Sequence, residues 1–176
     1  MLKSDCVEFG DHDLYYFDEA GFSLTPSVPY AWQPIGERIE LPGSKSSQLN
    51  VLGFMRHDGK HLDSYVTQGN IDSAVVIACI DNFCRKLVRP TTLVIDNAPV
   101  HGSGWFESMI PKWEAQNLFL WFLPPYCPEL NLIEILWKQI KYRWMPIDAY
   151  ISFEKLSSSL DNILANFGKQ YEICFA

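Results

Sequence analysis

Runs of apolar and aromatic residues separated by turn-forming residues dominate the first part of the chain. Residues 13–20 form an aromatic-rich run that favours a strand. Residues 48–69 hold two further runs of this kind, joined at Asp58-Gly59, a dipeptide typical of tight hairpin turns. Prolines and glycines interrupt residues 26–44, which predicts a long loop or a ragged hairpin. This part of the sequence therefore predicts three strands, two of them in a hairpin.

The rest of the chain alternates between helical and strand patterns. Residues 71–87 carry apolar side chains at helical spacing, and Asn70 or Asp72 can cap the N-terminus of this helix. The remaining strands are expected at residues 91–96 and 117–123, both as buried strands, and the remaining helices at about 103–115, 131–144 and 152–167. This order predicts an α/β fold with a mixed five-stranded sheet flanked by helices.

Three acidic residues occupy prominent positions in this predicted fold. Asp18 lies at the end of the first strand, Asp96 ends a buried strand, and Glu134 lies in the first turn of a helix. In such sheets, sites form at the carboxyl ends of the parallel strands, where both aspartates are expected. Converging carboxylates raise each other's pKa unless a cation neutralises them. Hard oxygen ligands suit Mg²⁺ or Mn²⁺, and two such ions can activate both the attacking and the leaving oxygen of a phosphodiester.

The helix that carries Glu134 supports this interpretation. Its apolar stripe, which would fix the helix on the sheet, consists of Ile133, Leu136, Trp137, Ile140 and Trp144. Glu134, Lys138 and Lys141 share a neighbouring face, so the two lysines could neutralise a DNA phosphate beside the metal ions.

Each of these residues also has an ordinary structural explanation. A single acid at a strand end is usually a cap or a turn residue. Glu134 could simply compensate the helix dipole, and Glu134 with Lys138 could be a surface ion pair one turn apart. Only the combination of the residues carries the functional prediction.

Composition limits the possible classes of protein. The 176 residues suit one domain, no apolar run is long enough to cross a bilayer, and the first residues lack the apolar core of a signal peptide. Five cysteines without a CxxC pair argue against a disulfide framework and a zinc knuckle, and favour a reduced, cytoplasmic setting. The net charge of −7 is unusual for a protein that binds nucleic acid, so metal ions or a further basic segment would have to supply positive charge.

Three sequence blocks together resemble the catalytic motifs of a known family. They read FDEAGF at residues 17–22, LVIDNAPVH at 93–101 and LPPYCPELNLIEILWKQIK at 123–141. In order and spacing they resemble mariner-like bacterial insertion-sequence transposases of the DDE superfamily. The segment AWQPIGERIELPG at residues 31–43 also resembles an insertion after the first strand in that family. The resemblance runs from about Asp13 to Trp144.

The resemblance implies a ribonuclease-H-like fold and a set of site residues. The catalytic and metal-binding acids would be Asp18, Asp96 and Glu134, with 37 residues between the last two. They would hold two ions of Mg²⁺ or Mn²⁺. Asn97 and His101 match family positions beside the second aspartate and are expected to support the site or to face DNA.

The resemblance also implies a function. It predicts a transposase catalytic domain that hydrolyses and joins DNA at transposon ends, acting as a homodimer in the bacterial cytoplasm near the nucleoid. Only 17 residues precede Asp18, whereas family members carry a helix-turn-helix region there, so residues 1–176 are expected to form the catalytic domain alone. Leu132 stands where the family often has proline, which is a mild change. Two alternatives stay open: an inactive remnant that serves as a binding or dimerisation module, and another ribonuclease-H-like nuclease.

Overall fold

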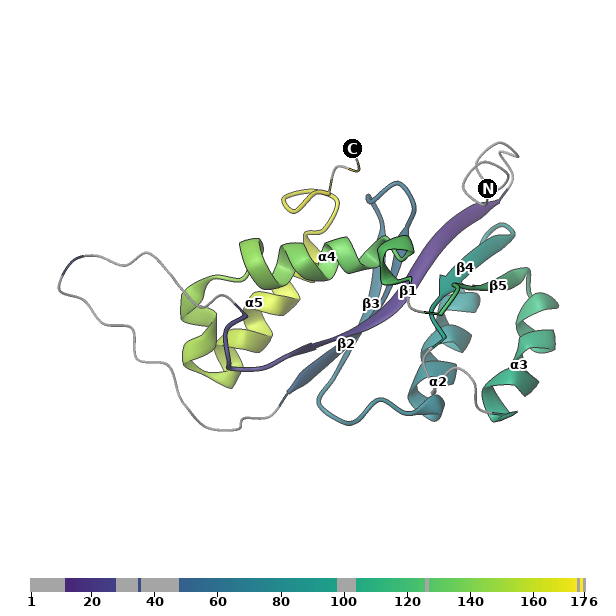
Figure 1. Ribbon diagram of the computed structural model, residues 1–176, viewed down its shortest axis with the longest axis horizontal. Helices are drawn as coiled ribbons and strands as arrows, with labels where there is room; N and C mark the ends of the chain where they lie inside the picture. Colours follow the sequence, from purple (N-terminus) through teal and green to yellow (C-terminus); the bar gives the residue numbers. More distant parts are fainter. Residues whose placement is uncertain are drawn as a thin grey trace.

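The computed structural model describes residues 12–27, 35, 48–97, 104–125, 127–173 and 175. Within these ranges one sheet is covered by helices on both faces (Figure 1). Its strands are β1 (Asp13–Phe22), β2 (Leu49–Arg56), β3 (Leu62–Thr67), β4 (Thr91–Ile95) and β5 (Leu118–Phe122). The helices are α2 (Ser73–Cys84), α3 (Gly104–Glu114), α4 (Ile133–Gln139) and α5 (Phe153–Ala165), with a π-helical segment at Ile140–Trp144 and 3-10 helices at Pro128–Leu130 and Ile147–Ile151.

The sheet has the mixed topology that the element order predicted. The strand order is β3-β2-β1-β4-β5, in which β1 pairs antiparallel with β2 and parallel with β4. The β2–β3 hairpin turns at Asp58-Gly59, and Gly59 has a φ of 67°, a conformation that favours glycine. The predicted α/β fold with a mixed five-stranded sheet is therefore confirmed.

Alternate residues of β1 point to opposite faces of the sheet. Tyr16 and Ala20 belong to the core that β1 forms with α4 and α5, whereas Tyr15 and Phe17 belong to the core under α2 and α3. Because side chains alternate along a strand, Asp18 lies on the same face as Tyr16 and Ala20. The strand thus presents Asp18 towards α4.

The helix ends follow the capping chemistry of the sequence. The side chain of Asp72 accepts a hydrogen bond from the backbone N–H of Val75 at 2.9 Å, so Asp72 rather than Asn70 caps α2. Ser152 caps α5 in the same way, through the N–H of Lys155. In the described part of the chain, every helix is too short or too polar to cross a bilayer.

β1 is longer than the aromatic-rich run predicted, and this changes the place of Asp18. The strand runs on to Phe22, which pairs with Leu49 of β2. Pairing with β4 covers only the first part of β1, from Asp13 to Tyr16. Asp18 therefore does not end the strand; it lies two residues beyond the part that is paired on both sides.

The prediction of a strand over residues 117–123 is confirmed, but the prediction that it is buried is wrong for most of its residues. The strand exists, but β5 is an edge strand in which Phe119, Trp121 and Phe122 are exposed. Leu118 and Leu120 pack in the core under α2 and α3. The opposite face of β5 lacks a comparable cover among the described residues, because α4 packs on β1 and β2.

The helix predicted over about 131–144 is divided into two segments. α4 ends at Gln139 and continues as π-helix from Ile140 to Trp144. A π-helical segment shifts the following side chains relative to an α-helical stripe. Trp144 is accordingly only partly buried, and its ring lies against Phe167 and Tyr171 at the edge of the core.

Candidate active site

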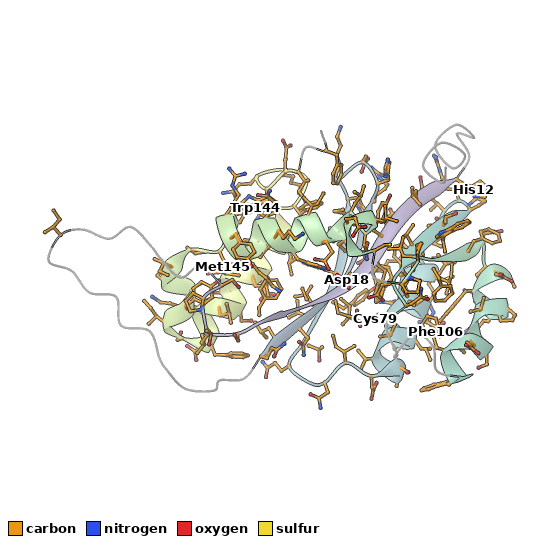
Figure 2. All side chains as sticks on the ribbon, viewed as in Figure 1. His12, Asp18, Cys79, Phe106, Trp144 and Met145 are labelled. Atoms are coloured by element: carbon orange, nitrogen blue, oxygen red, sulfur yellow. The ribbon has the colours of Figure 1, made fainter. Side chains whose placement is uncertain are left out.

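The two aspartates lie just beyond the part of β1 and β4 in which these adjacent parallel strands pair. β1 and β4 pair in register from Asp13 opposite Thr91 to Tyr16 opposite Val94. Asp18 lies two residues beyond the last of these pairs, and Asp96 directly follows the end of β4. Asp18 lies on the side of α4, where it accepts a hydrogen bond from this helix, and Asp96 is close enough for its charge to contribute to the raised pKa of Asp18. Figure 2 shows Asp18 on the middle part of β1, next to this helix.

Helix α4 brings the third acid to this face of the sheet. Glu134 lies in its first turn, and the buried residues Ile133, Leu136 and Trp137 fix the helix against β1 and β2. Asn131, which is 3% exposed, ties the segment before the helix to β1 by donating from Nδ2 to the carbonyl oxygen of Phe17 at 3.0 Å. The start of α4 is thus fastened to the residue that precedes Asp18.

Asp18 also contacts α4 directly. The indole Nε1 of Trp137 donates to Oδ2 of Asp18 at 3.1 Å. Gly53 of β2 pairs with Asp18, and a Cβ atom at this glycine would lie 2.7 Å from Cη2 of Trp137 and 2.9 Å from Cδ1 of Ile133. The absence of a side chain at residue 53 therefore lets the helix approach the sheet closely enough for this hydrogen bond.

The electrostatics of Asp18 include contributions from both other predicted acids. Burial, together with the charges of Glu134, Glu19 and Asp96, raises the pKa of Asp18 from its ordinary 3.8 to about 7, although a backbone hydrogen bond from Glu19 lowers it. Burial is the largest cause. A carboxylate in this position is stabilised by any cation that binds beside it.

The carboxylates suit a hard divalent cation, although they are not arranged as a closed cage. Among the described residues, His, Cys, Asp and Glu side chains nowhere form a group of three that could hold a metal as they stand. Mg²⁺ usually keeps several waters and takes only one or two protein carboxylates together with substrate phosphates. The donor chemistry of Asp18, Asp96 and Glu134 fits this open mode of binding, in which water and phosphate oxygens complete the coordination.

The other predicted site residues differ in their contacts and exposure. Asn97 is exposed, and its Nδ2 donates to the carbonyl oxygen of Leu123, which ties the ends of β4 and β5 together. Lys138 is exposed one turn after Glu134. Lys141 places its ammonium 5.4 Å from the centre of the Phe22 ring, at the far end of β1. His101 and most of residues 26–44 lie outside the described ranges.

Sequence reasoning did not single out the residues that fix Asp18 in place. Asn131 was read only as part of a motif, Trp137 only as part of the apolar stripe, and Gly53 only as part of a strand. The signals were present in the chain: a polar amide directly before a buried helix, and an indole among aliphatic residues. Both are side chains that need hydrogen-bond partners when they are buried.

Known proteins resemble this chain in sequence and in fold. The insertion element IS630 uncharacterized 39 kDa protein of Shigella sonnei is 26% identical over 134 residues, which cover 74% of this chain and 38% of that protein. The Mos1 mariner paired end complex with Mn matches with a TM-score of 0.59 and 15% identity, over 90% of this chain and 49% of the Mos1 chain. The catalytic core domain of BIV integrase gives a TM-score of 0.51 at 14% identity, over 85% of this chain and 82% of that chain.

These matches assign the fold and the family. The structural neighbours are transposase and integrase catalytic cores, so the fold is ribonuclease-H-like, as the resemblance implied. This chain spans about half or less of the length of the Mos1 and IS630 proteins that it matches. The family described as DDE superfamily endonuclease matches residues 13–157, from the first residue of β1 into α5. The chain is therefore a member of the DDE superfamily of endonucleases.

Proposed function

We propose that this chain is the catalytic domain of a DNA transposase, which cuts and joins phosphodiesters at transposon ends with divalent cations bound by Asp18, Asp96 and Glu134. The observation that carries the proposal is the position of Asp18 against α4, where the charges of Glu134 and Asp96 both contribute to its raised pKa. The relation to Mos1 structures that contain Mn and to an insertion-element protein supports both the cation and the DNA substrate.

Each acid has a distinct place in the proposed site. Asp18 in β1 and Asp96, which directly follows β4, would form the floor of the site, and Glu134 would approach it from the first turn of α4. Two Mg²⁺ or Mn²⁺ ions bound there would supply Lewis-acid chemistry, activating the attacking water and stabilising the leaving 3′ oxygen. Lys138, exposed one turn after Glu134, is placed to neutralise a phosphate of the bound strand. Lys141 is less well placed for this role, because it lies against Phe22.

The partners in this proposal are the transposon-end DNA, the target DNA and a second copy of the protein. In this proposal residues 13–157, which match the family, supply the catalytic chemistry, and most of the positive charge that holds DNA comes from other parts of the assembly. The net charge of −7 supports this proposal, because an acidic chain contributes little positive charge to DNA phosphates. Because its insertion-element relative is bacterial, we place the protein in the bacterial cytoplasm.

Two measurements test the proposal. Calorimetric titration with Mn²⁺ should show binding to the 176-residue chain that Asp96→Asn and Glu134→Gln each abolish. In a longer protein that also carries the DNA-binding region, the same variants should abolish metal-dependent nicking of DNA containing the element's ends. Asp148→Asn removes an exposed acid from the 3-10 helix Ile147–Ile151 and serves as the matched control, which should bind and nick like the wild type. Nicking that persists in Asp96→Asn contradicts the assigned site.

A further inference from the structure

Trp137 makes a specific polar contact that its place in an apolar stripe does not require. The side chain is 3% exposed, and its single hydrogen-bond donor is directed at Oδ2 of Asp18, at 3.1 Å. An indole N–H has one hydrogen to give, so it engages only one of the two carboxylate oxygens. The contact therefore distinguishes Oδ2 from Oδ1. The carboxylate also accepts a backbone hydrogen bond from Glu19, which restrains it further.

The surrounding backbone is shaped to admit this ring. Gly53 stands opposite Asp18 on β2, and a methyl group there would come within 3 Å of two atoms of the six-membered ring of Trp137. The edge of the indole also faces the ring of Phe22, with centroids 6.4 Å apart at 75°. The ring is thus confined between a glycine and an aromatic residue of β1, which fixes the direction of its N–H.

On the basis of the proposed function, we infer that Trp137 is a positioning residue that holds Oδ2 of Asp18 and leaves Oδ1 to bind the divalent cation. Fixing one oxygen restricts rotation of the carboxylate, so that the metal-binding oxygen is already oriented before the cation arrives. Partners of metal ligands act in this way in many proteins, and their removal commonly lowers metal affinity by about 10- to 100-fold.

The most direct test replaces Trp137 with 3-benzothienylalanine, which keeps the shape of the indole but has sulfur in place of the N–H. Calorimetric titration with Mn²⁺ should give an affinity at least about tenfold below that of the wild type, with little change in thermal stability. Trp137→Phe should lower the affinity by a similar factor, because it also lacks the donor.

The chain contains a matched control on the other face of the sheet. Trp113 is also fully buried, and its Nε1 donates to Oδ1 of Asp81 at 2.7 Å. Trp113→Phe removes the same kind of ring and the same indole–carboxylate hydrogen bond in the core under α2 and α3. It should destabilise the fold but leave the Mn²⁺ affinity within about twofold of the wild type.

Gly53→Ala provides a second, independent variant. Its added methyl group should displace Trp137 and lower the Mn²⁺ affinity about tenfold in the wild-type background. In the Trp137→Phe background the hydrogen bond is already lost, so the same change should alter the affinity less than about threefold. Equal effects in the two backgrounds would mean that Gly53 acts independently of Trp137.

The outcomes separate this inference from the proposed function. If the wild type binds Mn²⁺, Asp18→Asn abolishes binding and the benzothienyl variant binds as tightly as the wild type, the positioning role is wrong and the proposed site stands. If the wild type itself does not bind Mn²⁺, both are wrong. Weaker binding in the Trp137 and Gly53 variants, with unchanged binding in Trp113→Phe, supports the positioning role.

Discussion

The raised pKa of Asp18 predicts an unusual dependence of stability on pH. A carboxyl whose pKa is higher in the folded chain binds protons more tightly there than in the unfolded chain. Without metal, the free energy of unfolding should therefore fall as the pH rises from about 4 to about 7, and level off above. The cause is the burial of Asp18 next to Glu134 and Asp96, which disfavours its ionised form.

The size of the effect follows from the two pKa values. Raising the pKa from 3.8 to about 7 corresponds to about 4 kcal/mol at most, because each tenfold change in proton affinity is worth about 1.4 kcal/mol. The free energy of unfolding that the wild type loses through Asp18 between pH 5 and pH 8 is on the order of 2 to 3 kcal/mol. Asp18→Asn keeps the shape of the side chain and removes the ionisation, so it should remove this contribution.

Urea unfolding in EDTA at pH 5, 6, 7 and 8 measures the effect. The quantity of interest is the difference in free energy of unfolding between Asp18→Asn and the wild type, since other titrating groups cancel in it. Relative to the wild type, the free energy of unfolding of Asp18→Asn should rise by about 2 to 3 kcal/mol between pH 5 and pH 8. A difference that stays constant over this range, or that changes in the opposite direction, would refute the reasoning about the buried acids.

Three further predictions concern other parts of the molecule. Asn131→Ala should lower the free energy of unfolding by about 1 to 3 kcal/mol in urea, because the buried carbonyl of Phe17 loses its donor from Asn131. Asp72→Ala should lower it by about 1 kcal/mol through loss of the α2 cap, and Asp72→Asn, which can still cap, should cost less. The isolated chain should bind DNA weakly, with a shallow dependence on salt in fluorescence anisotropy, because its net charge is −7; nanomolar affinity at physiological salt would contradict this.

Much of the fold could be predicted because local patterns and tertiary structure agree. The Asp58-Gly59 turn, the helical spacing in α2 and the cap at Asp72 are each specified within a few residues of sequence. The burial of β5 could not be predicted in this way. Its apolar run describes the strand, but whether a helix covers each face depends on the path of distant segments.

The candidate site also has parts that local sequence indicates and parts that depend on tertiary contacts. Asp18, Asp96 and Glu134 could be proposed from the sequence because each stands at a recognisable place in a motif. Their joint placement depends on the register of β1 with β4 and on how closely α4 approaches β2. The roles of Gly53 and Trp137 appear only when residues more than 80 positions apart come together, so a single sequence does not reveal them.

The most direct test of the three-acid site is anomalous diffraction from crystals of the chain grown or soaked in Mn²⁺. We expect manganese peaks within coordination distance of Oδ1 of Asp18 and of carboxylate oxygens of Asp96 and Glu134. Crystals that diffract well but show manganese only elsewhere, or no manganese at all at saturating concentration, would contradict it.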